Sequence, residues 1–156
     1  MDAGFTLARL GALDLDGAAR LHRDAFEPMG EHAWTRQDLA GLLASPGSAG
    51  FLLTEAHFDI GMAICRVVAD EAELLTVAVD PGHRRRGGAR RLLDAVIGHA
   101  RDGGARTLFL EVGADNPAAR TLYDSLGFGV VGKRAGYYRR AGRAAADAFI
   151  MRLNLS

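Results

Sequence analysis

Cysteine is almost missing from this chain of 156 residues, in which Cys65 stands alone. A single thiol excludes an intrachain disulfide and a cysteine-rich zinc site. The five histidines follow neither an H-x-x-x-H nor an H-E-x-x-H spacing, so no metal site is predicted. Because Cys65 lies in the apolar stretch 60–68, we expect a buried and unreactive thiol.

Long apolar runs and net charge are missing as well. No uncharged apolar run approaches the roughly 18 residues that a membrane span needs, and residues 1–4 lack the basic and apolar regions of a signal peptide. We therefore expect a soluble, cytoplasmic protein that makes no membrane contact. Nineteen acidic residues balance nineteen Lys and Arg residues, which argues against direct nucleic-acid binding.

The balanced charge is unevenly divided along the chain. Residues 1–80 carry thirteen acidic residues and five arginines, whereas residues 81–156 carry fourteen basic and six acidic residues. Such a division suits a second half that binds an anionic ligand and a first half that attracts a cationic partner. Simple mixing of opposite charges on the folded surface explains the division equally well.

The length fits one domain, 1–156, and the order of its segments predicts an α+β fold rather than a doubly wound one. Helices are expected where apolar residues recur at helical spacing, and strands where short apolar runs end in turns. The almost unbroken run 107–112 is typical of a central strand buried on both faces. The expected elements are an extended segment at 5–10, helices at 15–26 and 35–45, strands at 50–55, 60–68 and 74–79, a helix at 88–102, the strand at 107–112, a helix at 116–127, and closing strands at 128–131 and 148–153 around a basic segment at 133–143.

A loop rich in glycine and arginine joins the strand at 74–79 to the helix at 88–102, and residues 77–89 read VAVDPGHRRRGGA. Free N–H groups at the helix start, the positive end of the helix dipole and flanking arginines together favour a phosphate site. An aspartate at Gly88 would then place a side chain and a negative charge where phosphate sits. The alternative is a turn whose glycines serve only the backbone and whose arginines are solvated.

Two phosphate motifs fit this loop poorly. A P-loop requires Gly-Lys-Ser/Thr, and the loop has no lysine. A dinucleotide fingerprint would place Leu92 where its third glycine belongs, so it remains a weaker alternative. Instead, the pattern R-x-x-G-x-A at Arg84, Gly87 and Ala89 resembles the acetyl-CoA pyrophosphate loop of the GNAT acetyltransferases. A second pattern, N-x-x-A-x-x-L-Y-x-x-x-G-F over 116–128, is similar to another signature of that superfamily.

Further stretches at 70–79, 110–112, 136–138 and 147–151 resemble the RimI subfamily, whose members acetylate the N-terminal alanine of a small-subunit ribosomal protein. The resemblance implies a mixed, mostly antiparallel sheet with a β-α-β core that binds acetyl-CoA, with no metal. It also implies a basic protein N-terminus as acceptor. The sequence departs from the subfamily at Gly113, Asp115 and Arg139, where Arg, Ser and Pro are common, and all three flank the acceptor side.

Amine acetylation from a thioester needs a base, an oxyanion site and a proton donor for the thiolate. The resemblance makes Glu111 the base and Tyr123 the proton donor. Strand alternation places Glu111 on the face of Phe109 beside an apolar core, and helical spacing places Asn116, Arg120 and Tyr123 on one face. The residues that the resemblance assigns to acetyl-CoA are Val77, Ala78, Val79, Arg84, Arg85, Arg86, Gly87, Gly88, Ala89, Asn116 and Tyr123, and those assigned to the acceptor are Tyr137 and Tyr138.

Each role has a plainer alternative. Glu111 can be a structural carboxylate paired with an arginine, Tyr123 can pack on pantetheine without moving a proton, and the paired tyrosines can be ordinary strand residues. Two other functions also remain open. One is an acetyltransferase of the same fold that acts on a polyamine, an aminoglycoside or a free amino acid. The other is a domain that binds acetyl-CoA as a sensor ligand.

Overall fold

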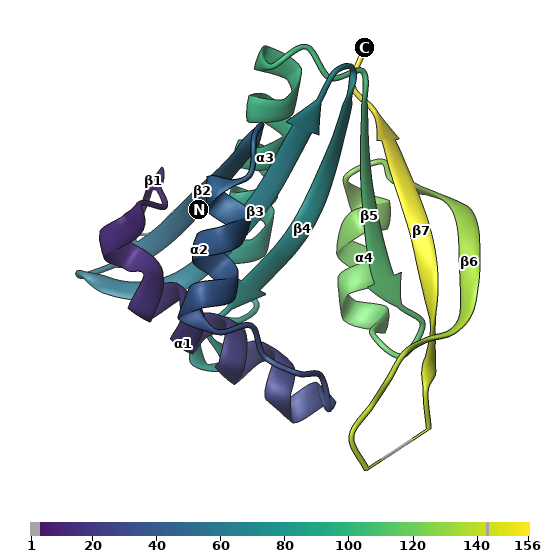
Figure 1. Ribbon diagram of the computed structural model, residues 1–156, viewed down its shortest axis with the longest axis horizontal. Coiled ribbons are helices and arrows are strands. Elements are labelled where there is room, and N and C mark those ends of the chain that lie inside the picture. The colour runs from purple at the N-terminus through teal and green to yellow at the C-terminus, as the bar shows by residue number, and fades with distance from the viewer. Residues whose placement is uncertain (1–3, 143) are drawn as a thin grey trace.

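The computed structural model describes residues 4–142 and 144–156, and its centre is a seven-stranded mixed sheet (Figure 1). The strand order is β1-β2-β3-β4-β5-β7-β6, with β4 and β5 parallel and the other neighbours antiparallel. The predicted α+β class with a mostly antiparallel sheet is confirmed. The strands are β1 Phe5–Arg9, β2 Ser48–Glu55, β3 Phe58–Val68, β4 Glu71–Val79, β5 Thr107–Gly113, β6 Gly129–Tyr138 and β7 Ala146–Asn154.

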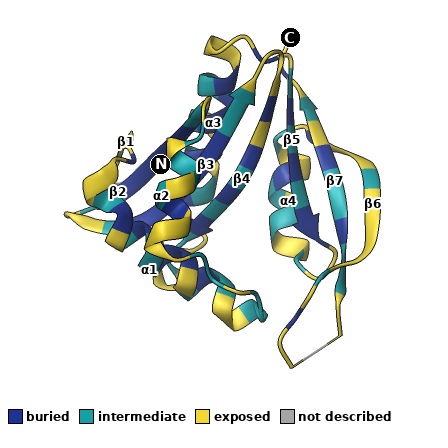
Figure 2. Cartoon of the chain, viewed as in Figure 1, coloured by how far each residue is buried: buried dark blue, intermediate teal, exposed yellow. Residues whose placement is uncertain are grey.

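Four α-helices cover the two faces of the sheet unequally. Helices α1 (Leu15–Phe26) and α2 (Arg36–Ala44) lie on what we call the front face, against β2 to β4 (Figure 1). Helices α3 (Gly88–Asp102) and α4 (Pro117–Ser125) lie on the back face. Buried side chains therefore form two cores, one on each face. Figure 2 colours the buried residues along these helices and strands dark blue. In front of β5, β6 and β7, no helix covers the sheet among the described residues.

Local signals explain why several elements begin and end where they do. Helix α2 starts at a capping box, in which the Thr35 hydroxyl accepts from the Asp38 N–H at 3.1 Å and the Asp38 carboxylate accepts from the Thr35 N–H at 2.9 Å. The β2–β3 turn holds Ala56 and His57 at φ angles of 49° and 68°, as a tight hairpin requires.

Cys65 is fully buried as predicted, and burial raises the pKa of its thiol to about 11.

The two parallel strands separate soon after they meet. β4 pairs with β5 only from Glu71 to Glu73, opposite Thr107 to Phe109. Immediately afterwards, β4 carries a bulge, because Cys65 of β3 pairs with Leu74 whereas Ile64 pairs with Thr76, which leaves Leu75 as the extra residue. A bulge bends its strand and increases the local twist. From this point β4 and β5 diverge, and the sheet opens between them (Figure 1).

Two expectations about strands were wrong. Strand β5 is not buried on both faces: Leu108, Leu110 and Val112 are buried, whereas Phe109 and Glu111 are only half-buried. The cause is the missing helix in front of this part of the sheet. Strand β6 continues to Tyr138 instead of ending near Val131, so most of the basic segment is an exposed edge strand. Among the described residues, no helix is long and apolar enough to cross a membrane.

Candidate active site

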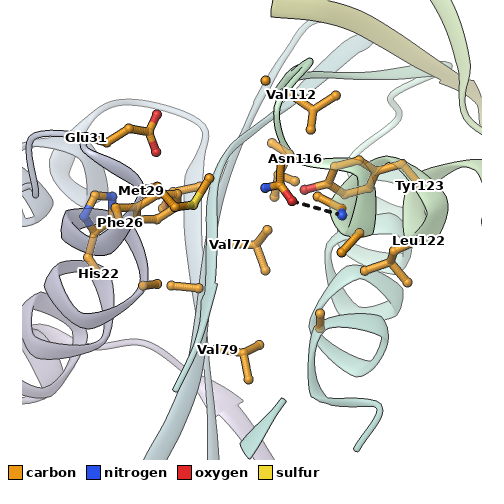
Figure 3. A pocket seen from close by; sticks show the side chains of 18 of the residues that line it. His22, Phe26, Met29, Glu31, Val77, Val79, Val112, Asn116, Leu122 and Tyr123 are labelled. Atoms are coloured by element: carbon orange, nitrogen blue, oxygen red, sulfur yellow. Dashed lines mark hydrogen bonds between the residues drawn. The ribbon is translucent and has the colours of Figure 1, made fainter. Parts of the chain in front are cut away.

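The opening between β4 and β5 is a cavity of about 1170 Å³. Both diverging strands contribute to its walls, together with the loop after β4, the start of α4, the end of α1 and the end of β6. Figure 3 shows β4 between two groups of lining side chains, with His22, Phe26, Met29 and Glu31 on one side and Val77, Val79, Asn116 and Tyr123 on the other. The cavity therefore passes through the sheet and is reached from both faces.

The edge of β4 that faces this cavity presents open main-chain groups. The Asp80 N–H donates to the Ile60 carbonyl of β3 at 2.8 Å. Main-chain groups alternate in direction along a strand, so those of Ala78 also face β3 and those of Val77 and Val79 face the opposite edge. Because β4 pairs with β5 only as far as Glu73, these two N–H groups point into the opening.

The loop after β4 is held by one carboxylate. Asp80 accepts hydrogen bonds from the Gly82 N–H at 3.1 Å and from the Arg20 guanidinium at 3.1 Å, and it contacts His83 Nδ1 at 2.8 Å. These bonds, with that from His83 foremost, hold the pKa of Asp80 below its usual range. The loop then enters α3 through Gly87, whose φ of 84° suits glycine. Because no helical turn precedes them, the first N–H groups of α3 have no partner within the helix.

The structure distinguishes among the loop residues predicted to bind the cofactor. Arg84, Arg85, Gly87, Gly88 and Ala89 line the cavity, and so does Arg90. Arg86 does not: its guanidinium turns away and donates to both carboxylate oxygens of Glu55, one of them at 2.9 Å. Gly88 also has a packing role that the sequence did not indicate. A Cβ there would lie 3.2 Å from a methyl of Leu53, so glycine lets α3 approach the sheet closely.

Helix α4 brings two of the predicted residues to the back face of the cavity. The Asn116 side chain accepts from the Ala119 N–H at 3.2 Å and caps the helix. Tyr123, about two turns further along the helix, is 6% exposed. Burial raises the pKa of the Tyr123 phenol to about 12, so it keeps its proton at neutral pH. Arg120 does not join them: its guanidinium stacks over the Phe149 ring at 4.5 Å.

Glu111 reaches the same cavity from the opposite face of the sheet. Its strand neighbours Leu110 and Val112 are buried in the back core, so alternation directs Glu111 to the front with Phe109, away from that apolar core rather than beside it. The carboxylate is 27% exposed, and Arg134 of β6 approaches it to 3.6 Å. A carboxylate in front of the opening and a phenol behind it can serve two different partners of one reaction.

The front side of the cavity contains groups that the sequence did not indicate. His22 is buried between the rings of Phe26 and Trp34, and its Nδ1 accepts from the Trp34 N–H at 3.1 Å. Burial lowers its pKa to about 4, so the ring is neutral. Glu31 and Arg140 also line this side, near the predicted Tyr137 and Tyr138. They come from loops without a motif, so only the fold brings them together.

Comparison with known proteins identifies the class. The model of the Acetyltransferase (GNAT) family matches residues 15–128, and the chain belongs to this family. It is an acetyl-CoA-dependent N-acetyltransferase, as predicted. Within the described residues, no group of three or more His, Cys, Asp or Glu side chains is placed to hold a metal ion.

Several similar proteins have names that specify the acceptor or the type of amine. The [Ribosomal protein bS18]-alanine N-acetyltransferase of Escherichia coli K12 is 38% identical over 156 aligned residues, which cover 97% of this chain and 98% of that protein. The N-alpha-acetyltransferase RimI of Mycobacterium tuberculosis is 36% identical, over 94% and 90% of the two chains. The crystal structure of the ribosomal-protein-S18-alanine N-acetyltransferase from Escherichia coli superposes with a TM-score of 0.88 over 97% of this chain and 94% of that one, at 36% identity.

A charge change at Ala89 tests whether the start of α3 binds the pyrophosphate. Ala89→Glu places a carboxylate in the first turn, where the helix dipole favours it, so the fold should persist. Repulsion between the new carboxylate and the phosphates, reduced by solvent screening, should cost about 2 kcal/mol of CoA binding free energy. The CoA affinity of Ala89→Glu should therefore be roughly 30-fold weaker than that of the size-matched Ala89→Gln. Calorimetric titration at two salt concentrations measures this gap, which should narrow at high salt. Equal affinities for the two variants would remove the turn from the site.

Proposed function

We propose that this chain transfers acetyl from acetyl-CoA to the N-terminal alanine of the small-subunit ribosomal protein bS18, and that it does so in the cytoplasm where ribosomal proteins are made. The observation that carries the acceptor class is the division of charge around the cavity. Arg84, Arg85 and Arg90 line the end at the loop after β4. Three carboxylates, Glu31, Glu73 and Glu111, line the front against one arginine, Arg140. An anionic co-substrate suits the first end and an ammonium group suits the second.

The two faces then divide the reaction. On the back, the N–H groups at the start of α3 would bind the pyrophosphate, as helix N-termini bind anions, and the side chains of α4 would lie along the pantetheine. The Val77 and Val79 N–H groups would bind the pantetheine amide and the carbonyl oxygen as it becomes negative. The thioester would thus lie in the opening of the sheet, between Tyr123 behind and Glu111 in front.

Glu111 would take the proton from the incoming ammonium on the front face, either directly or through a water. The neutral amine would attack the thioester carbonyl to form the N–C bond, and the surplus proton on its nitrogen would pass to solvent as the C–S bond breaks. The departing thiolate would leave toward the back, where the Tyr123 hydroxyl is available as a hydrogen-bond donor. An α-amine has a pKa of about 7.7–8.0, against about 10.4 for a lysine side chain, so one carboxylate deprotonates an α-amine more readily. This difference favours a protein N-terminus.

A comparison of acceptors tests the proposal. We expect the highest kcat/KM with a peptide that carries the N-terminal residues of bS18 and starts with alanine, and roughly 100-fold or greater loss when its N-terminus is blocked. Initial rates with the free peptide, the blocked peptide and spermidine provide the measurement. Equal rates on free and blocked peptides would indicate lysine side chains as acceptors. Faster turnover of spermidine would place the chain among the small-molecule acetyltransferases.

A further inference from the structure

The front side of the cavity ends at a buried ion cluster that joins three separate segments. Arg140, two residues beyond β6, has a side chain only 1% exposed. Its Nε and Nη2 donate to the two carboxylate oxygens of Asp115, which lies between β5 and α4, at 2.9 Å each. Its Nη1 lies 2.9 Å from Glu31 Oε1, in the segment between α1 and α2. Both partners hold the pKa of Arg140 above its usual value, so the guanidinium stays charged.

Two further contacts fasten the same segments. The Arg140 guanidinium lies over the ring of Tyr138, 4.8 Å from its centre. The next residue, Ala141, donates its N–H to the Gly30 carbonyl at 2.9 Å. Gly30 has a φ of 80°, and a Cβ there would approach the Ala141 nitrogen to 3.0 Å, so this contact requires glycine. The chain after β6 is therefore fastened to the chain after α1 across the front of the cavity.

Gly113 makes room for this cluster. A Cβ at Gly113 would lie 2.5 Å from Asp115 Oδ1 and 2.7 Å from Arg140 Nη2. Gly113 and Asp115 are two of the three positions at which the sequence departs from the RimI pattern. The structure relates them to each other: one leaves the space for the Arg140 guanidinium, and the other binds it.

We propose that Arg140 is a positioning residue for the acceptor: through its contacts with Glu31, Asp115 and Tyr138 it fixes the front opening, so that a peptide N-terminus enters with its amine directed at Glu111. This inference rests on the proposed function. The cluster also supplies charge, because two carboxylates and one guanidinium leave one negative charge beside the cavity. Glu31 lines the cavity and is 20% exposed, so this charge attracts an ammonium group on its way in.

Arg140→Met keeps the length of the side chain and removes its charge and its forked donors. We expect the KM for the bS18 peptide to rise roughly tenfold and kcat to fall by less than about threefold, because misplaced binding groups weaken acceptor binding before they affect the chemistry. The affinity for CoA, measured by calorimetry, should stay within about twofold, since its proposed site lies on the other face. Arg140→Lys should recover only part of the loss, because an ammonium cannot replace the planar fork.

Gly113→Ala tests the same inference with every charge retained and covers the case in which Arg140→Met fails to fold. The new methyl must displace Arg140 or Asp115, so the peptide KM should again rise while the affinity for CoA is kept. Gly129→Ala is the matched control, because a Cβ at Gly129 meets no atom within 4 Å. Its peptide KM should equal that of the wild type.

The outcomes separate this inference from the proposed function. Suppose that the wild type acetylates the peptide and that the peptide KM is unchanged both in Gly113→Ala and in folded Arg140→Met. This result would leave the proposed function intact and overturn the role of Arg140. An equal loss of CoA affinity and peptide affinity would also overturn it, because it would show a general structural defect. A wild-type protein that does not acetylate the peptide would overturn the proposed acceptor, and this inference with it.

Discussion

Replacement of Glu111 by glutamine is expected to lower kcat at pH 7 by roughly 10²–10⁴-fold, the range that general-base catalysis supplies, and to leave CoA affinity within about twofold. Glutamine keeps the shape of the side chain and loses the proton acceptor. The rate of the variant should rise with pH as the acceptor amine, with a pKa of about 7.7–8.0, loses its proton to the solvent. The gap between wild type and variant should therefore be largest below pH 7 and narrow toward pH 9.

A pH–rate profile for each protein measures this result. Glu73→Gln is a suitable control, because Glu73 is another carboxylate on the front of the cavity and its nearest base, Arg66, is 3.9 Å away. We expect it to change the peptide KM a few-fold and kcat very little. A Glu111→Gln protein with the rate and pH dependence of the wild type would exclude Glu111 as the base and leave it as a structural partner of Arg134.

The elements behind the cavity could be predicted from the sequence because each is a continuous stretch. The strand, loop and helix start from Val77 to Ala89 and the helix from Asn116 to Tyr123 each carry their own signals: a turn, a cap and an apolar face. Local chemistry was enough to predict which elements these stretches form. The close approach of α3 to the sheet at Gly88 and the turn of Arg86 toward Glu55 depend on neighbours distant in sequence, so local signals indicated neither.

The opening itself was not predictable. It depends on the bulge at Leu75, which exists only in the pairing of β4 with β3. Nothing in the residues from Leu74 to Thr76 distinguishes this bulge from a regular strand, since all three suit a half-buried sheet position. Likewise, the exposed strand β6 lacks the apolar alternation that would mark its end, so its continuation to Tyr138 was missed.

The front face was the least predictable part of the site. Glu31 and Arg140 stand in segments that read as solvated loops, and a charged residue in a loop is ordinarily exposed. The one available signal was the joint departure at Gly113 and Asp115, where a small residue and a new carboxylate indicate that an arginine from elsewhere packs there. Such a signal indicates that a partner exists but does not identify it, and the structure identifies the partner as Arg140.

Tyr123→Phe is expected to lower kcat about 100-fold while the fold and the affinity for CoA are kept. The ring is buried and packs against Phe128 with 5.8 Å between the ring centres, and phenylalanine retains that packing. Only the hydroxyl is lost. Tyr137→Phe provides the matched control, because Tyr137 is 48% exposed on β6 and loses the same group. We expect its kcat to stay within about threefold of the wild type.

The pH dependence of this loss reports how the phenol acts. Burial raises the pKa of Tyr123 to about 12, above the value of about 8.5 for an ordinary thiol. The phenol thus holds its proton more tightly than a solvated thiolate would. We infer that Tyr123 stabilises the departing sulfur by donating a hydrogen bond as its charge develops, with no early release of the proton. The ratio of wild-type to Tyr123→Phe rates should then be constant from pH 6 to pH 10. A ratio that falls toward one as the pH approaches 10 would show that Tyr123 ionises in this range and would contradict the hydrogen-bond role.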